Sequence, residues 1–89
     1  MPHDEGMLFV FPADRVRCLW MRDTPLSLSA AFLDAAGRIV EFMELPALSN
    51  EIRCAGQPAR YVLEVHRGWF ADAGVGVGDT VSGLALDGD

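Results

Sequence analysis

The sequence contains no lysine, and its 89 residues include only two cysteines, two tryptophans and one tyrosine. Without a primary amine at a set place, a chain can form neither a Schiff base nor a P-loop. Seven arginines against thirteen acids leave a net charge of -6, which repels phosphate backbones and anionic lipid surfaces. We therefore expect neither a nucleic-acid partner nor a membrane partner.

The two cysteines belong to no metal-binding or redox motif. Cys18 and Cys54 are far apart and fit no CxxC or Cys/His spacing, so the sequence predicts neither a zinc site nor a disulfide framework. We interpret both as reduced thiols. A disulfide between them would need Cα atoms within about 7 Å, which a sequence alone does not show.

Long hydrophobic runs and catalytic motifs are also missing. No apolar run approaches the roughly 18 residues of a membrane-spanning helix, and Met7–Phe11 is too short for a signal-peptide core. A cytoplasmic location is therefore the default expectation. The chain has no HExxH, no paired His-x-His and no GxSxG, and none of its hydroxyl groups has a sequence context for activation. We expect no catalytic residue, no metal and no cofactor.

What is present indicates one small domain over residues 1–89. The 51% hydrophobic and 22% charged content lie near the averages of globular proteins. A chain of this length buries a thin core and does not divide into two. Residues 1–6 form a polar tail before the first apolar run.

Alternation of apolar and polar residues predicts strands along most of the chain. The strand at Arg15–Arg22 places Trp20 on one face and Met21 on the other. Gly37 supplies the positive φ of a short hairpin loop. Pro12 ends the first strand, because proline lacks a backbone donor. The expected strands are Met7–Phe11, Arg15–Arg22, Leu28–Asp34, Arg38–Leu45, Ala59–Val65 and a last one near Thr80–Leu86.

Two segments break the strand pattern. Pro46–Pro58 is polar and bounded by prolines, so it is predicted to be the longest loop. Trp69–Ala73 fits one or two helical turns that Gly74 ends as a C-cap. We predict an α+β fold, with a small, mainly antiparallel sheet of about five or six strands or a partly open barrel, and one short helix. The expected core comprises Phe9, Phe11, Trp20, Phe32, Val40, Leu63 and Val81.

Five motifs follow one another along the chain: GMLFVF, LWMRDT, AAFLDAAGRIV, PARYVLEV and RGWFADAGVGVGD. Together, over residues 6–83, they resemble DUF192, a family of bacterial and archaeal proteins. The resemblance implies a small mixed fold rich in antiparallel strands with short helices. It implies no established activity.

The chain departs from the pattern of this family in three ways. Family members usually carry Phe-Trp-Met-Lys-Asn-Thr where this chain has Leu-Trp-Met-Arg-Asp-Thr at residues 19–24. The family favours an aspartate where this chain has Ser29, so the carboxylate expected there is absent. Relatives also have a longer segment before the GMLFVF motif, often with an export signal, whereas Met1–Glu5 precede it here. Their location is therefore not carried over to this chain.

The LWMRDT motif contains the first candidate site. Trp20 would provide an apolar wall and Arg22 would bind an anion. In the structural alternative, Trp20 packs inward while Asp23 and Thr24 cap the bend that follows. Glu64 would act as a base if burial raised its pKa, or would pair with an arginine across the sheet. The candidate binding residues are Trp20, Arg22, Asp23, Thr24, Arg60 and Glu64.

Two classes of function are open. The first, which we favour, is a non-enzymatic module that binds a small molecule or a peptide. The second is a hydrolase-like enzyme that uses Glu64 or Asp79, with Arg22 or Arg60 as electrostatic support. Asp79 more commonly forms an Asx-type turn in such a context. Because Met7–Phe11 is apolar on both faces, we also expect a homodimer, formed by edge-to-edge pairing or by strand exchange. The alternative is a monomer whose polar tail, residues 1–6, covers this edge.

Overall fold

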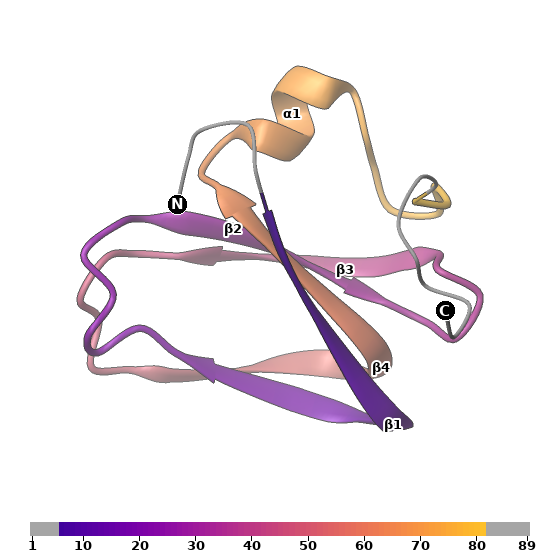
Figure 1. Ribbon diagram of the computed structural model, residues 1–89, viewed down its shortest axis with the longest axis horizontal. Coiled ribbons are helices and arrows are strands. Elements are labelled where there is room, and N and C mark those ends of the chain that lie inside the picture. The colour runs from indigo at the N-terminus through magenta and orange to yellow at the C-terminus, as the bar shows by residue number, and fades with distance from the viewer. Residues whose placement is uncertain (1–5, 82–89) are drawn as a thin grey trace.

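The computed structural model describes residues 6–81, which form one antiparallel sheet and one short helix (Figure 1). The sheet contains β1 (Gly6–Trp20), β2 (Leu28–Leu33), β3 (Ile39–Leu45) and β4 (Ile52–His66), and helix α1 (Trp69–Ala73) follows β4. The spatial order of the strands is β1-β4-β2-β3. The predicted α+β fold with a mainly antiparallel sheet and one short helix is confirmed, although the described residues form four strands, fewer than predicted.

β1 continues through Pro12, so the prediction that this proline ends the first strand is wrong. Val10 pairs with Tyr61 and Arg15 pairs with Ala59, so β1 contains extra residues between these two pairs. Such a bulge bends the strand and leaves the extra residues unpaired, which is why a proline is tolerated there. Two expected strands therefore form one bent strand.

β4 also bends, and the loop predicted over residues 46–58 is shorter than expected. β4 already begins at Ile52, and residues 52–59 pair with residues 15–20 of β1. Figure 1 shows β1 and β4 turning back together at one end of the molecule. We call these paired outer halves, residues 15–20 and 52–59, the returning ribbon. Residues 46–58 lack a local apolar run, and their pairing with β1 depends on the bend in both strands.

The first core lies between the returning ribbon and the sheet. Three hydrogen bonds join the ribbon to β3. Gln57 Nε2 donates to the Val40 carbonyl at 3.2 Å, and the Gly56 N–H donates to the Glu41 carboxylate at 2.8 Å. Arg53 Nη1 donates to the Glu44 carbonyl at 3.3 Å. Side chains rather than a strand pairing thus make this connection, which leaves the sheet partly open. The buried members are Met21, Leu28, Ala30, Phe32, Leu45, Ala55, Ala59 and Val62, with Phe9, Phe11, Leu19, Val40 and Met43 packed against them.

Trp20 lies outside this core, so the prediction that it packs inward is wrong. The residues alternate as expected, but the buried face is the one that holds Leu19 and Met21. Met21 is 4% exposed and Trp20 is 51% exposed. Alternation separates two faces of a strand without stating which face meets the core. The other predicted core residues are buried or partly buried: Phe9, Phe11, Phe32, Val40, Leu63 and Val81.

The two cysteines form a disulfide, so the interpretation of both as reduced thiols is wrong. Cys18 and Cys54 lie directly opposite each other in the returning ribbon, with Cα atoms 3.9 Å apart. They are 36 positions apart in the sequence. Only the joint bend of β1 and β4 brings them together.

Helix α1 covers the other face of the sheet and has the bounds that the sequence predicts. Gly74 has a φ of 72° and its N–H donates to carbonyls of the last turn, which is a glycine C-cap. Phe70 is 6% exposed, and its ring centroid lies 5.0 Å from that of Phe42. The second core consists of Ala31, Leu33, Ile39, Tyr61, Leu63, Val65 and Phe70, with Leu8, Phe42, Trp69, Val75 and Val81 packed against them.

The predicted hairpin loop between β2 and β3 is confirmed. Asp34 Oδ1 accepts hydrogen bonds from two loop N–H groups, both at 2.9 Å, and Gly37 has a φ of 82°. Beyond α1, Thr80 forms an isolated antiparallel bridge with Arg38. Val81 is not in a strand, and residues 82–86 of the strand expected near Thr80–Leu86 lie outside the described residues.

Candidate functional site

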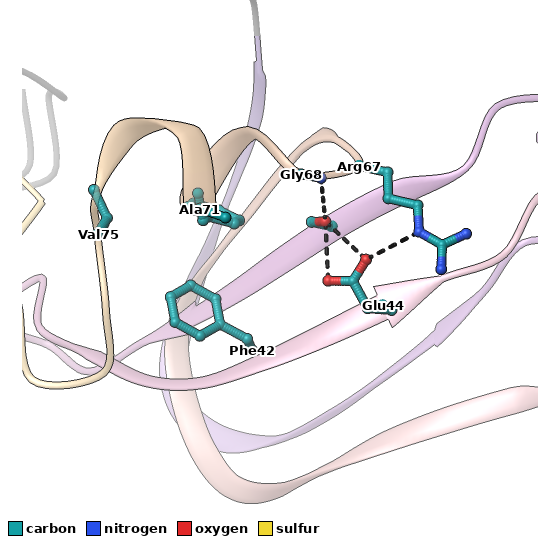
Figure 2. A pocket seen from close by; sticks show the side chains of 8 residues that line it. Phe42, Glu44, Arg67, Gly68, Ala71 and Val75 are labelled. Atoms are coloured by element: carbon teal, nitrogen blue, oxygen red, sulfur yellow. Dashed lines mark hydrogen bonds and ion pairs between the residues drawn. The ribbon is translucent and has the colours of Figure 1, made fainter.

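A pocket of about 360 Å³ lies where α1 packs against β2 and β3 (Figure 2). Side chains of the two strands form its floor, and the turn before α1 and the helix itself form its wall. Sites for small molecules commonly have volumes of about 300–1,000 Å³. The lining residues are Ser29, Phe42, Glu44, Arg67, Gly68, Phe70, Ala71 and Val75.

Ser29, Glu44 and Arg67 form the polar end of the pocket. Ser29 lies directly opposite Glu44 in the β2–β3 pair, and its hydroxyl lies 3.0 Å from each carboxylate oxygen. The Gly68 N–H donates to the same hydroxyl at 3.3 Å. Arg67 Nε lies 3.5 Å from Glu44 Oε1. The Glu44 carboxylate is therefore held between a hydroxyl and a guanidinium (Figure 2).

The turn between β4 and α1 sets the position of this polar end. Gly68 has a φ of 87°, a left-handed conformation that favours glycine. The Arg67 N–H donates to the Ser27 carbonyl at 3.4 Å, which ties the turn to the start of β2. The turn thereby places the Arg67 side chain beside Glu44 and the Gly68 N–H beside Ser29.

Aromatic and aliphatic side chains form the other end of the pocket. The rings of Phe42 and Phe70 are inclined at 46°. Figure 2 shows Phe42, Ala71 and Val75 grouped on the side away from Arg67. The Val75 N–H donates to the Phe70 carbonyl at 3.0 Å, which holds the segment after α1 against the helix. Polar and apolar groups are thus segregated to two ends of one pocket.

The hydroxyl and the charged groups of this pocket are already engaged with one another. Ser29 is 2% exposed, and its hydroxyl is held by two partners. The pocket lining includes no histidine of the described residues, so the histidine that usually activates a serine is lacking. Residues 6–81 also contain no group of three or more His, Cys, Asp or Glu that could hold a metal ion. A carboxylate, a guanidinium and an apolar surface are the groups that a ligand would meet.

None of the six predicted binding residues lines this pocket. Trp20 Nε1 donates to the Asn50 carbonyl at 3.1 Å, and the Arg22 guanidinium lies 5.4 Å from the centre of the Trp20 ring. The Thr24 N–H donates to the Met21 carbonyl at 3.0 Å, so a backbone hydrogen bond closes the bend after β1. The side-chain capping by Asp23 and Thr24 stays a prediction. Ligand binding at this surface stays a prediction. Four of the predicted residues are neighbours at the end of β1: Trp20, Arg22, Asp23 and Thr24.

Arg60 and Glu64 lie elsewhere, on the second half of β4. Arg60 Nε lies 2.8 Å from Asp14 Oδ1, in the bulge of β1. Glu64 is half-buried between Met7 and Ala30 of the neighbouring strands, and desolvation raises the pKa of its carboxyl above the ordinary value of 4.5. Within residues 6–81, no arginine forms the cross-strand ion pair considered for Glu64.

Asp79 stabilises a turn. Its Oδ2 accepts the Gly76 N–H at 2.7 Å, and its own N–H donates to the Gly76 carbonyl at 3.1 Å. The turn runs from Gly76 to Asp79 and is closed by the side chain of its last residue, so it differs from the Asx-type turn that was the structural alternative, in which an acid binds the N–H two residues further on. Asp79 and Arg60, two of the groups considered for a hydrolase, are therefore engaged in structural contacts outside the pocket.

Most pocket residues were not predicted from the sequence. Ser29 was noted only as the position where the carboxylate of the family is absent. The hairpin loop alone would not have identified Glu44, because continuing the pairing from Leu33 and Ile39 sets Ser29 opposite Met43. An irregularity between Phe32 and Leu33 shifts the register by one residue and brings Glu44 opposite Ser29. No local pattern indicated Arg67, which reaches the pocket through the turn after β4.

Comparisons with known proteins agree on the fold. A family model named DUF192, described as an uncharacterized ACR, matches residues 1–83. A Sinorhizobium meliloti 1021 protein, described as a "putative transcription regulator", is 34% identical with a TM-score of 0.85, over 90% of this chain and 63% of its own. A protein of unknown function from Novosphingobium aromaticivorans DSM 12444 is 26% identical with a TM-score of 0.82, over 90% of this chain and 58% of its own.

The chain thus spans about three fifths of the length of each of these two solved structures. No curated protein matches the sequence. The comparisons establish the family and the fold, and the function has to be argued from the site.

Proposed function

Because the chain belongs to the DUF192 family, which is described only as uncharacterised, we propose its function from its pocket: it binds a small amphipathic molecule without turnover. The segregation of charged and apolar groups to two ends of the pocket carries this proposal. The apolar body of the ligand would lie against Phe42 and Phe70, and its polar head would reach Glu44 and Arg67. Apolar burial and charge-assisted hydrogen bonds would both contribute to affinity.

The net charge bears on the class of partner, and the disulfide bears on the compartment in which the protein would bind its ligand. A net charge of -6 opposes nucleic-acid binding, so we do not extend the regulatory description of the Sinorhizobium protein to this chain. Disulfides persist in oxidising compartments and are rare in the cytosol, so we propose an oxidising compartment in place of the cytoplasmic default. Among residues 6–81, no helix is long and apolar enough to cross a membrane.

A substitution on α1 tests the proposal. Ala71 lines the pocket and its side chain is exposed on a short helix, so Ala71→Trp should fill the pocket and leave the fold intact. Ala73→Trp is the matched control, because Ala73 is exposed on the same helix and does not line the pocket. A panel of small metabolites would be screened by thermal shift, since a ligand at 100 times its Kd stabilises the folded state by about 2.7 kcal/mol.

We expect at least one amphipathic compound to stabilise the wild type and the Ala73→Trp variant. The same compound should lose most of its effect on Ala71→Trp. A panel in which every stabilising compound acts equally on both variants, or in which none stabilises the wild type, would refute binding at this pocket.

A further inference from the structure

The polar end of the pocket presents charges of both signs side by side. Arg67 Nε and Glu44 Oε1 are 3.5 Å apart, and the two side chains are 64% and 53% exposed. An exposed ion pair of this kind contributes little to stability, so ligand charges can compete for it at small cost to the fold. The pair is therefore available to a ligand.

Arg67 retains most of its hydrogen-bonding capacity. Its Nε pairs with Glu44, and within residues 6–81 the guanidinium has no other hydrogen bond or ion pair. Figure 2 shows the two terminal nitrogens turned away from Glu44. A planar guanidinium with two free nitrogens binds a carboxylate through two parallel hydrogen bonds.

Glu44 is oriented and still has room for a cation. Its Oε2 accepts only from the Ser29 hydroxyl among the described residues, so lone pairs remain on that oxygen. The Gly68 N–H donates a hydrogen bond to the Ser29 oxygen and so holds the hydroxyl in place beside Glu44. An ammonium group, which has three donors and no acceptor, matches what this carboxylate offers.

A ligand with a single charge would meet an unfavourable neighbour at this site. A carboxylate bound to Arg67 would lie close to Glu44, and an ammonium bound to Glu44 would lie close to Arg67. A head group with both charges satisfies each partner and avoids both repulsions. In an α-amino acid the ammonium and the carboxylate are attached to the same carbon, so they can lie against two opposite charges that are 3.5 Å apart.

The apolar end selects the side chain of the ligand. Phe42 and Phe70, with Ala71 and Val75, leave a surface suited to an aromatic or large aliphatic group. We infer that the pocket takes an α-amino acid with an apolar side chain, bound as its zwitterion. This inference rests on the proposed function and adds the chemical class of the ligand to it.

Calorimetric titration with three matched probes tests the inference. L-Phenylalanine carries both charges, 3-phenylpropionate only the carboxylate and 2-phenylethylamine only the ammonium. Each would be titrated into the wild type, Glu44→Gln and Arg67→Gln. Glu51→Gln and Arg38→Gln are the charge-matched controls, because both residues are exposed and neither lines the pocket.

The wild type should bind L-phenylalanine at least about tenfold more tightly than either analogue, since each analogue lacks one charge-assisted contact. Glu44→Gln should weaken L-phenylalanine about tenfold and strengthen 3-phenylpropionate, whose carboxylate no longer meets Glu44. Arg67→Gln should weaken L-phenylalanine and strengthen 2-phenylethylamine. These opposite responses of the two analogues would not arise from a general loss of structure, and both control variants should bind as the wild type does.

Equal affinity for the three probes, or no binding of any of them, would overturn the zwitterion inference. If another compound of the metabolite panel still stabilised the wild type and did not stabilise Ala71→Trp, the proposed function would stand and only the zwitterion inference would be wrong. If no compound distinguished Ala71→Trp from Ala73→Trp, both would be refuted.

Discussion

Among residues 6–81, Glu64 is the carboxyl group whose pKa is raised by burial. It is half-buried on β4, and desolvation raises the pKa of its carboxyl above 4.5. The folded state therefore holds this proton more tightly than the unfolded state does. The resulting stabilisation is complete below the unfolded pKa and is lost as the pH rises through the folded pKa.

Replacing this carboxyl by an amide should remove that pH dependence. We expect Glu64→Gln to have a higher Tm than the wild type at neutral pH, with the difference shrinking as the pH falls to 4.5 and below. Thermal unfolding followed by circular dichroism across this range measures the difference. Glu51→Gln, which removes an exposed acid, is the control. A Tm difference for Glu64→Gln that stays constant with pH would contradict this account.

Ser29, which stands where the family resemblance implies an aspartate, is compatible with the Glu44 carboxylate opposite it. The family resemblance implies an aspartate at this position, but here Glu44 lies directly opposite at hydrogen-bond distance. Two carboxylates this close would repel each other, and one of them would take up a proton. A serine donates a hydrogen bond where an aspartate would repel. In this chain the carboxylate of the pocket lies on β3.

Among the elements, the returning ribbon is the part most dependent on a single covalent bond. It consists of two strands, and an isolated pair of strands is marginally stable in water. The Cys18–Cys54 disulfide joins these strands across 36 positions of sequence. The bond therefore restricts the unfolded chain and also holds the outer halves of β1 and β4 together.

Replacing both cysteines by serine should lower the free energy of unfolding by about 2–4 kcal/mol. Urea unfolding under non-reducing conditions measures this loss, and hydrogen exchange should locate it in residues 15–20 and 52–59. Dithiothreitol should destabilise the wild type and leave the double variant unchanged. Rapid labelling of the native, unreduced protein by a thiol reagent would show that the disulfide is absent.

At the scale of the whole molecule, homodimer formation stays a prediction that concerns β1. This strand forms one edge of the sheet, and Val10 on it is 62% exposed. An exposed edge offers backbone groups for pairing with a second copy. We expect a dimer by β1-to-β1 pairing. Because each chain carries a net charge of -6, screening by salt should favour it.

Light scattering over a range of protein and salt concentrations tests this prediction. Val10→Lys should shift the mass toward that of the monomer, because a lysine on an edge strand opposes edge-to-edge pairing. Val77→Lys is the control, since Val77 is 64% exposed and lies outside the sheet. A monomer mass for the wild type at high micromolar concentration would rule the dimer out.

Several local features of this chain follow from neighbouring residues alone. Asp34 and Gly37 determine the hairpin loop, because a side-chain acceptor and a residue tolerant of positive φ are both needed within a few positions. Gly74 ends α1 for the same kind of reason. Alternation identified the strand that contains Tyr61 and Leu63, since the period of a strand is a local property.

Other features were decided only when distant segments met. The alternation of two faces along β1 could be predicted from the sequence. Whether Trp20 or Met21 faced the core depended on how the returning ribbon folded over the sheet. The disulfide and the pocket depend on the same long-range pairing. Cys18 meets Cys54 because both strands bend, and Arg67 meets Glu44 because a turn carries the chain across β2 toward the β3 side chain. Local patterns specify period and turn, whereas the juxtaposition of distant side chains is a property of the assembled sheet.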